Sequence, residues 1–258
     1  MRASSGRPHF TVGLVVHPSR SVLDSIRLIT RYAGRSGAAV IARWCDAERV
    51  GPDVVTVAPE EFADRVDVLI SLGGDGTMLG AMRLVVGRSV PVLGVNHGNL
   101  GFLIEVGPQE LEPALDRLAE GRYTLEPHSC LEAGDSRAFN DIVIAAAEPL
   151  SSLTLALEVN GLRHGLGKDD HIVLRNPSGE VPLIFSVDGT SAGPLQPGAE
   201  LSVRLRTEAV DVVRFDADTH AQRNRVKLSL LDLPLRRDQL VELIPQPLRD
   251  QAERLRRG

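Results

Sequence analysis

The feature that most constrains this chain is an apolar run that ends in three glycines around a single aspartate. Residues 66–72 are mostly Val, Leu and Ile, which is typical of a strand buried on both faces in a parallel sheet. The five residues that follow, here called the glycine turn, are Gly73, Gly74, Asp75, Gly76 and Thr77. Because glycine has no Cβ, this turn can take positive φ angles and let a ligand touch its backbone.

The glycine turn has the properties of a phosphate site. A helical pattern begins near Thr77, and such a helix directs unpaired N–H groups and the positive end of its dipole at the turn. Asp75 does not fit a plain phosphate site, because a carboxylate repels phosphate unless it binds Mg²⁺ or takes a proton from a nucleophile. The alternative is an ordinary strand–helix turn in which Asp75 caps the helix.

Composition and charge exclude several classes of protein. The 258 residues are 43% hydrophobic and 24% charged, as in an ordinary globular protein. Aromatic residues make up 3% and the net charge is −5, which argues against a nucleic-acid or membrane-surface binder. Cys45 and Cys130 lack metal-ligand spacing and predict free thiols in a reducing compartment. Without a signal-peptide pattern or a membrane-spanning stretch, we expect a cytoplasmic protein.

The first half of the chain alternates strand and helix patterns. Strands are expected at residues 10–16, 38–42, 54–57, 66–72 and 90–95. Helices are expected up to residue 35, at 59–65, from 77 to 86 and at 109–120, with a cap at Ser19 or Ser21 and a loop at 46–51. This alternation predicts a parallel sheet, whose ligands gather beyond the carboxyl ends of the strands. The glycine turn and residues 98–101 both follow strand ends, so they should face one crevice.

The second half has a different pattern. Short strands are expected at residues 123–126, 142–147, 153–159, 172–175, 183–187, 201–206 and 210–215. They are separated by Gly, Pro, Asn and Asp, which indicates an antiparallel β domain. The predicted fold is therefore α/β, with a Rossmann-like N-terminal domain at 1–121 and a β-rich C-terminal domain at 122–246. Residues 247–258 are expected to form a tail.

Four stretches of the chain resemble the NAD kinase family. The glycine turn is shared with the diacylglycerol and sphingosine kinases, whereas residues 91–103 (Pro-Val-Leu-Gly-Val-Asn-His-Gly-Asn-Leu-Gly-Phe-Leu) are more specific for NAD kinases. Residues 138–144 (Ala-Phe-Asn-Asp-Ile-Val-Ile) look like the family's Asn-Glu/Asp motif. Residues 185–189 (Phe-Ser-Val-Asp-Gly), continued at 198–201, look like its late strand pair around an Asp-Gly turn. The resemblance covers about residues 10–216.

The resemblance implies a phosphate-binding role for the first two stretches. Asp75 would be the general base on the acceptor hydroxyl, and Gly73, Gly74, Gly76 and Thr77 would contact nucleotide phosphates. Asn99 would bind phosphate or cap a turn. Phe102 would cover an apolar face of the acceptor, unless it is an ordinary core residue.

The third stretch implies an acceptor site. Asn140 and Asp141 have the hydrogen-bonding groups to hold ribose hydroxyls or an adenine edge, although an Asn-Asp turn between strands is a common feature. Asp170 is a further acceptor-binding candidate. With its neighbours Asp169 and His171 it forms a polar run that a solvated loop explains better than a metal site, because adjacent residues on a strand point to opposite faces.

One part of the family pattern is missing. NAD kinases carry a Thr-Pro-Thr-Gly-Ser-Thr-Ala-Tyr loop and a Ser-Ala-Gly-Gly segment after the Asn-Glu/Asp motif. Residues 169–183 keep a proline and a glycine but no threonine, alanine or tyrosine, and a deletion of the loop explains them equally well. Tyr32 and Tyr123, the two tyrosines, lie elsewhere in the sequence. We therefore expect an altered acceptor site and poor use of NAD.

The predicted function is phosphoryl transfer. We expect an ATP- and Mg²⁺-dependent kinase that transfers the γ-phosphoryl to a hydroxyl of NAD or of a smaller nucleoside or polyol. The alternative is a non-catalytic relative that binds a nucleotide and regulates a partner. Expected partners are ATP and a small-molecule acceptor, with neither nucleic acid nor membrane, in a homodimer or homotetramer.

Overall fold

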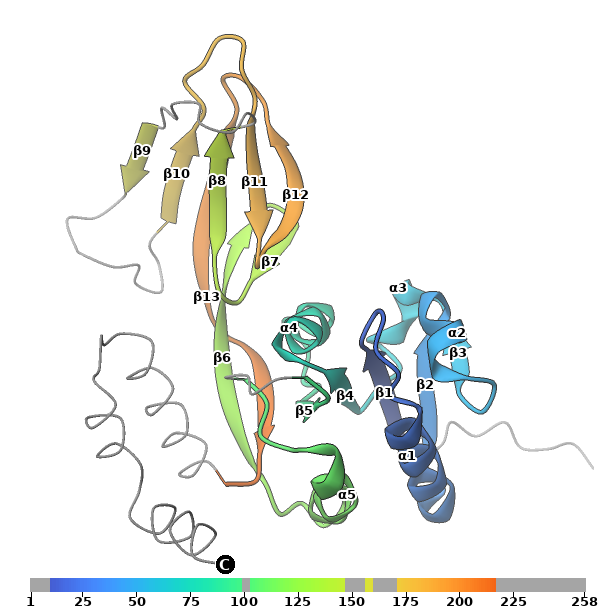
Figure 1. Cartoon of the computed structure of the whole chain (residues 1–258). Helices are drawn as coiled ribbons and strands as arrows, with labels where there is room; N and C mark the ends of the chain where they lie inside the picture. Colours follow the sequence, from blue (N-terminus) through green and yellow to red (C-terminus); the bar gives the residue numbers. More distant parts are fainter. Residues whose placement is uncertain (1–9, 99–102, 147–155, 160–170, 217–258) are drawn as a thin grey trace, which may run out of the picture. The chain divides into compact units, whose positions relative to one another are not determined.

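The structure is a computed structural model that describes residues 10–98, 103–146, 156–159 and 171–216 (Figure 1). Almost all of these residues belong to one compact unit, Met1–Arg214. Only Phe215 and Asp216 are described from the unit that follows. Within the described ranges, no helix is both long enough and apolar enough to cross a membrane.

The N-terminal part contains five parallel strands in the order β3-β2-β1-β4-β5. The strands are β1 (Thr11–Val16), β2 (Ala39–Arg43), β3 (Val55–Val57), β4 (Val68–Gly73) and β5 (Val92–Asn96). The helices are α1 (Leu23–Ser36), η1 (Trp44–Asp46), α2 (Ala47–Val50), α3 (Pro59–Phe62), α4 (Asp75–Leu84), η2 (Pro108–Glu110) and α5 (Leu111–Ala119). The chain leaves β1 for β2 on one side and later returns to β4 on the other. The switch point, where α/β sheets bind ligands, therefore lies between β1 and β4.

The core of this part lies around β4 and α4. Every residue of β1 and β4 is buried, as the apolar run predicted. Met78 and Met82 of α4 are also fully buried and pack in the same cluster as Leu69. Gly94 of β5 makes room for Ile104 and for this helix, because a Cβ there would lie 2.9 Å from Cγ1 of Ile104 and 3.2 Å from the sulfur of Met78. Close packing of α4 on the sheet holds the glycine turn in place.

The C-terminal part is mostly antiparallel. Its strands are β6 (Thr124–Ala133), β7 (Ser136–Ala138), β8 (Ile142–Ala146), β9 (Ala156–Val159), β10 (His171–Arg175), β11 (Leu183–Val187), β12 (Thr190–Leu195) and β13 (Glu200–Arg214). β12, β11 and β8 form a separate sheet. β13 pairs antiparallel with β6 and β10, and its Val212 pairs parallel with Val92 of β5. One sheet thus runs from the parallel strands into the β-rich part.

The predicted fold class is confirmed, and several element boundaries were wrong. Strands expected at 201–206 and 210–215 are one strand, β13, with a register shift between Arg206 and Val210. Glu208, inside this irregularity, has a φ of 51°, which explains the polar break in the pattern. β6 continues well beyond residue 126 although it contains Pro127, and β12 was missed because it contains Gly193 and Pro194. Proline and glycine lower the strand signal of a sequence.

Two helical expectations were also wrong. Residues 46–51, expected as a loop, contain the end of η1 and the short helix α2. Neither Ser19 nor Ser21 caps α1, because the N-cap is Val22 and no side chain makes a capping hydrogen bond. The domain division at residue 121 stays a prediction, and the tail at 247–258 lies outside the described residues.

Candidate active site

The glycine turn joins β4 directly to α4. β4 ends at Gly73, Gly74 is the N-cap, and α4 begins at Asp75, two residues earlier than expected. None of the three glycines uses the positive φ that glycine allows. A Cβ on Gly73 would lie 2.2 Å from Oγ1 of Thr77, which explains why this residue has no side chain.

Gly74 and Gly76 serve a different purpose from Gly73. A Cβ on either residue would meet no described atom within 4 Å. Their backbone is therefore open on one side, at the N-terminus of a helix whose first N–H groups lack intrahelical partners. Such an arrangement suits an anion.

A cavity of about 370 Å³ lies on the open side of the glycine turn. We call it the switch-point cleft. Its lining residues are Val15, Val16, His17, Pro18, Arg43, Asp46, Arg49, Gly74, Gly76, Thr77 and Gly80. They come from the ends of β1 and β2 and from the first turns of α4, so the cleft opens at the switch point of the sheet. Its size is within the range of about 300–1,000 Å³ typical of small-molecule sites.

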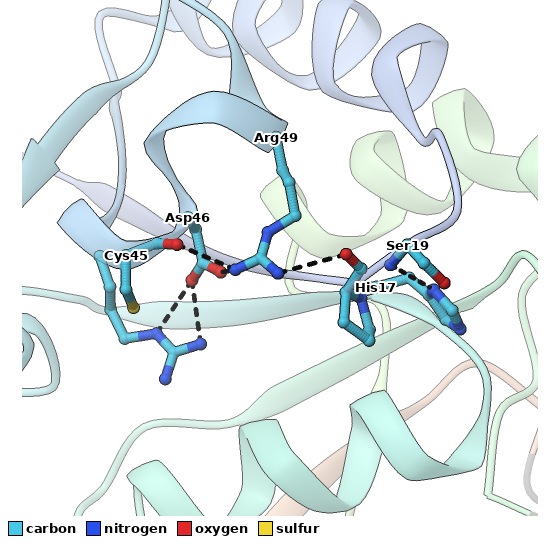
Figure 2. A network of polar contacts seen from close by, with 7 residues as sticks. His17, Ser19, Cys45, Asp46 and Arg49 are labelled. Atoms are coloured by element: carbon cyan, nitrogen blue, oxygen red, sulfur yellow. Dashed lines mark hydrogen bonds and ion pairs between the residues drawn. The ribbon is translucent and has the colours of Figure 1, made fainter.

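Two arginines line the wall of the switch-point cleft that β2, η1 and α2 provide. Arg43 donates a hydrogen bond of 3.0 Å from Nε to Oδ2 of Asp46, and its Nη2 forms an ion pair with the same oxygen at 2.9 Å. Arg49 donates to the other oxygen of Asp46, and also to the carbonyl of Cys45 at 3.0 Å (Figure 2). The side chain of Asp46 is only 1% exposed, whereas those of Arg43 and Arg49 are 23% and 36% exposed. One buried carboxylate thus holds two guanidinium groups at the cleft, with net positive charge.

The exit loop of β1 forms the adjacent wall. Nδ1 of His17 accepts hydrogen bonds from the backbone N–H groups of Ser19 (3.2 Å) and Arg20 (2.9 Å). The backbone N–H of His17 donates to the carbonyl of Leu72 at 2.9 Å, which holds this loop beside the end of β4. Figure 2 shows Arg49 reaching toward the loop that carries His17 and Ser19.

Asp75 faces away from the switch-point cleft. It does not line the cavity, and Oδ1 accepts a hydrogen bond from the backbone N–H of Leu103 at 3.3 Å. The carbonyl of Leu103 accepts a hydrogen bond of 2.7 Å from the buried Arg214. The capping alternative is wrong, because Gly74 is the N-cap and no side chain caps the helix. Asp75 is therefore directed toward Leu103, the last of residues 96–103, here called the second loop.

Both described ends of the second loop contact the glycine turn, but of residues 98–101, expected to share one crevice with this turn, only Gly98 is described. The backbone N–H of His97 donates to the carbonyl of Gly73 at 2.8 Å. A Cβ on Gly98 would lie 3.5 Å from Cα of Gly74. Asn99 and Phe102 lie outside the described residues, so their predicted roles stay predictions.

Asn140 and Asp141 lie between β7 and β8 with exposed side chains. Their backbone N–H groups donate to Oδ1 of Asp188, at 2.8 Å and 3.3 Å. Oδ2 of Asp188 accepts a hydrogen bond of 2.6 Å from Arg83 of α4, the helix that begins at the glycine turn. Asp170 is outside the described residues, while its neighbour His171 begins β10. The structure thus ties one predicted acceptor segment to α4.

Sequence reasoning missed the arginines near the glycine turn. Arg43 and Arg49 line the switch-point cleft, and Arg20 donates a hydrogen bond to the carbonyl of His97. All three lie in or near the segments that follow β1 and β2, and β1 is the strand that pairs with β4 at the switch point. Basic residues in these exit segments were the available signal. No group of three or more His, Cys, Asp or Glu side chains that could hold a metal ion occurs within the described ranges.

Both the sequence and the fold of this chain are similar to known proteins. Residues 12–123 match the family described as ATP-NAD kinase N-terminal domain. The NAD kinase of Ralstonia nicotianae is 31% identical over 211 residues, which cover 78% of this chain and 70% of that protein. The NAD kinase of Azotobacter vinelandii is 30% identical over 186 residues, which cover 68% of this chain and 63% of that protein.

Two solved structures have similar folds. Yeast NADH kinase complexed with NADH has a TM-score of 0.72 at 17% identity, over 89% of this chain and 90% of that chain. An NAD kinase from Archaeoglobus fulgidus in complex with ATP has a TM-score of 0.58 at 17% identity, over 85% of this chain and 99% of that chain. These likenesses support the two-part architecture described above.

The open backbone of the glycine turn leads to a first prediction. Gly74→Val should greatly weaken ATP binding, because the added methyl groups would fill the space that a phosphate needs. The fold should be kept, because Gly74 has an extended backbone (φ −104°, ψ −169°) that valine adopts readily. Isothermal titration calorimetry with ATP checks the loss, and thermal unfolding checks the fold.

Gly34→Val is a matched control for this prediction. A Cβ on Gly34, in α1, also meets no described atom within 4 Å, but Gly34 does not line the switch-point cleft. This variant should bind ATP like the wild type. Unchanged ATP affinity in Gly74→Val would mean that the glycine turn has only a structural role.

His97 leads to a prediction about pH. Its Nε2 lies 3.1 Å from Oγ of Ser25, and burial, followed by the nearby Arg20, lowers the pKa of its imidazole below the ordinary 6.5. The unfolded chain therefore binds a proton more readily than the folded chain, so the free energy of unfolding should decrease as pH falls below about 6.5. In His97→Gln the free energy of unfolding should depend less on pH. Some dependence should remain, because burial also lowers the pKa of His128. Denaturant unfolding at about pH 7.5 and about pH 5.5 measures the difference; equal pH dependence in both proteins would contradict the prediction.

Proposed function

The chain belongs to the NAD kinase family, and on this basis we propose that it is an ATP- and Mg²⁺-dependent phosphotransferase. It would transfer the γ-phosphoryl group to a hydroxyl of NAD or of a smaller nucleoside or polyol. The proposal rests mainly on the position of the glycine turn, which has a different chemical environment on each side. An open, positively charged cleft lies on one side of the turn, and the carboxylate of Asp75 lies on the other.

The switch-point cleft is the proposed site of the triphosphate. The open backbone at Gly74 and Gly76 lets phosphate oxygens approach the N–H groups of the first turn of α4. Arg43 and Arg49 on the opposite wall add guanidinium donors, which suit phosphate oxygens in charge and geometry. Both sides of the cleft thus stabilise negative charge.

Asp75 is the proposed general base. A base must reach the proton of the attacking hydroxyl, and Asp75 points toward the second loop rather than into the switch-point cleft. An acceptor hydroxyl beside Asp75 would approach the γ-phosphoryl from the side opposite the cleft wall. Such an arrangement suits in-line transfer, in which positioning and charge stabilisation supply most of the rate enhancement.

The residues at the glycine turn fit a Mg²⁺ ion. Mg²⁺ in kinases is usually held by one or two carboxylates together with substrate phosphates, so a cluster of protein ligands is not required. The phosphates in the switch-point cleft would be its main ligands, since Asp75 faces away from the cleft and both oxygens of Asp46 accept hydrogen bonds from arginines. When bound, the ion neutralises charge on the phosphates.

Two findings bear on the nature of the acceptor. The relatives at about 30% identity are named NAD kinases, which favours NAD. The missing Thr-rich loop favours a smaller acceptor, and Tyr32 offers no substitute because its hydroxyl donates a hydrogen bond of 2.8 Å to Asp116 of α5. Family membership and the position of Asp75 both favour catalysis over the non-catalytic alternative. A cytoplasmic location and a homodimer or homotetramer remain proposals.

A substitution at Asp75 tests the proposed chemistry. Asp75→Asn keeps the size of the side chain and one acceptor oxygen for Leu103, but it removes the basic carboxylate. The turnover number should fall by about 10²–10⁴, the usual contribution of a general base. Steady-state assays of ADP release measure this, with Asp64→Asn at an exposed carboxylate as the control. Near wild-type turnover in Asp75→Asn would contradict the assignment.

The acceptor is tested by a direct screen. Purified protein with ATP and Mg²⁺ is assayed against NAD, NADH, nucleosides and sugars, following ADP release. Each lost hydrogen bond to a buried ligand group costs about 1–3 kcal/mol, so the absence of two or three should weaken NAD binding about a hundredfold or more. We expect a smaller hydroxyl compound to be the better acceptor. Efficient NADP formation at micromolar NAD would show that the loss of the loop has no consequence.

A further inference from the structure

Asp188 lies in the tight turn that joins β11 to β12. Val187 pairs with Thr190, so Asp188 and Gly189 form a two-residue hairpin loop. Both have positive φ angles, 46° and 74°, as a type I′ turn requires. Asp-Gly is a common sequence for this turn, which accounts for the backbone of Asp188 but not for the position of its side chain.

The carboxylate of Asp188 is buried and accepts four hydrogen-bond donors. Its side chain is 0% exposed. Arg83 donates to Oδ2 at 2.6 Å, and the backbone N–H of Phe139 lies 3.1 Å from both oxygens. The backbone N–H groups of Asn140 and Asp141 donate to Oδ1. In return, the backbone N–H of Asp188 donates to the carbonyl of Asp141 at 3.0 Å.

These contacts fix the backbone of residues 139–141, here called the Asn-Asp loop, while leaving its polar side chains exposed. Three consecutive N–H groups are held by one carboxylate, whereas the side chains of Asn140 and Asp141 remain accessible. A loop with an ordered backbone and free polar side chains is suited to bind a ligand without a large loss of conformational entropy.

The Asn-Asp loop is attached twice to the region that carries the glycine turn. Arg83 belongs to α4, and it follows Asp75 by eight residues, or about 12 Å along the helix. Phe139 packs against the hydrophobic cluster that includes Met78 and Met82 of the same helix. A single rigid element thus has Asp75 at its beginning and the ion pair with Asp188 near its end.

We propose that Asp188 is a positioning residue for the phosphoryl acceptor. Its carboxylate orders the Asn-Asp loop and, through Arg83, holds this loop at a set position relative to Asp75. This inference rests on the proposed function, in which Asn140 and Asp141 bind the acceptor. Asp188 touches no reacting group itself, so its effect should appear in acceptor binding and not in the binding of ATP.

Asp188→Asn is the sharpest test. Asn-Gly forms the same type I′ turn, so the hairpin should be kept. The Asn amide, however, has N–H donors of its own, which would face the N–H donors of the loop. It also carries no negative charge to pair with Arg83. The KM for the acceptor should rise roughly tenfold to a hundredfold, while the KM for ATP stays within about twofold of the wild type. Amide hydrogen exchange in residues 139–141 should become faster.

A second pair of variants separates this role from general stability. Arg83→Met removes the ion pair and should raise the acceptor KM in the same direction as Asp188→Asn. Arg88→Met, just beyond α4, removes an exposed ion pair with Asp64 (2.9 Å) and should leave both KM values unchanged. An unchanged acceptor KM in folded Asp188→Asn, or an equal rise in the KM of ATP and acceptor, would overturn the proposal.

Binding measurements distinguish failure of this proposal from failure of the proposed function. If the wild type transfers phosphate to no acceptor, the proposed function fails and calorimetry with NAD decides the role of Asp188. Weaker NAD binding and faster exchange at 139–141 in Asp188→Asn would support the positioning role. Equal NAD binding, no NAD binding by either protein, or unchanged exchange would overturn it.

Discussion

The structure depends on the absence of side chains where β4 meets α4. Gly73 accommodates Thr77, while Gly74 and Gly76 leave the backbone open at the switch point of the sheet. The first turn of α4 therefore lines the cleft at the ends of β1 and β2. A side chain at Gly74 or Gly76 would take up the space that an anion needs to reach these N–H donors.

Charge is distributed differently on the two sides of the glycine turn. On the side of the switch-point cleft, the buried Asp46 holds Arg43 and Arg49, which leaves a net positive wall for phosphates. On the other side, Asp75 faces the second loop, whose end at Leu103 is also held by Arg214. The helix α4 connects this arrangement to the Asn-Asp loop through Arg83 and Asp188. One helix thus connects the glycine turn with the Asn-Asp loop, the proposed donor and acceptor sites.

Sequence alone predicted the parts of the fold that depend on local pattern. The parallel sheet, and a second loop beside the glycine turn, could be predicted from the apolar run, the glycine turn and the alternation of strands and helices. The arginine wall depends on which strands are neighbours in the sheet, which local pattern does not contain. The role of Asp188 was hidden for the same reason, since a hydrogen bond between residues 140 and 188 depends on how distant strands pair. Prolines and glycines within β6 and β12 concealed strands that long-range pairing stabilises.

The central claim is that the glycine turn separates a phosphate cleft from the acceptor side. A crystal structure of the protein with a non-hydrolysable ATP analogue and Mg²⁺ tests this claim most directly. The account predicts β- and γ-phosphate oxygens within hydrogen-bond distance of the backbone at Gly74 and Gly76, with Arg43 or Arg49 on the opposite wall. Phosphates bound on the side of Asp75 and the second loop, with the switch-point cleft empty, would contradict it.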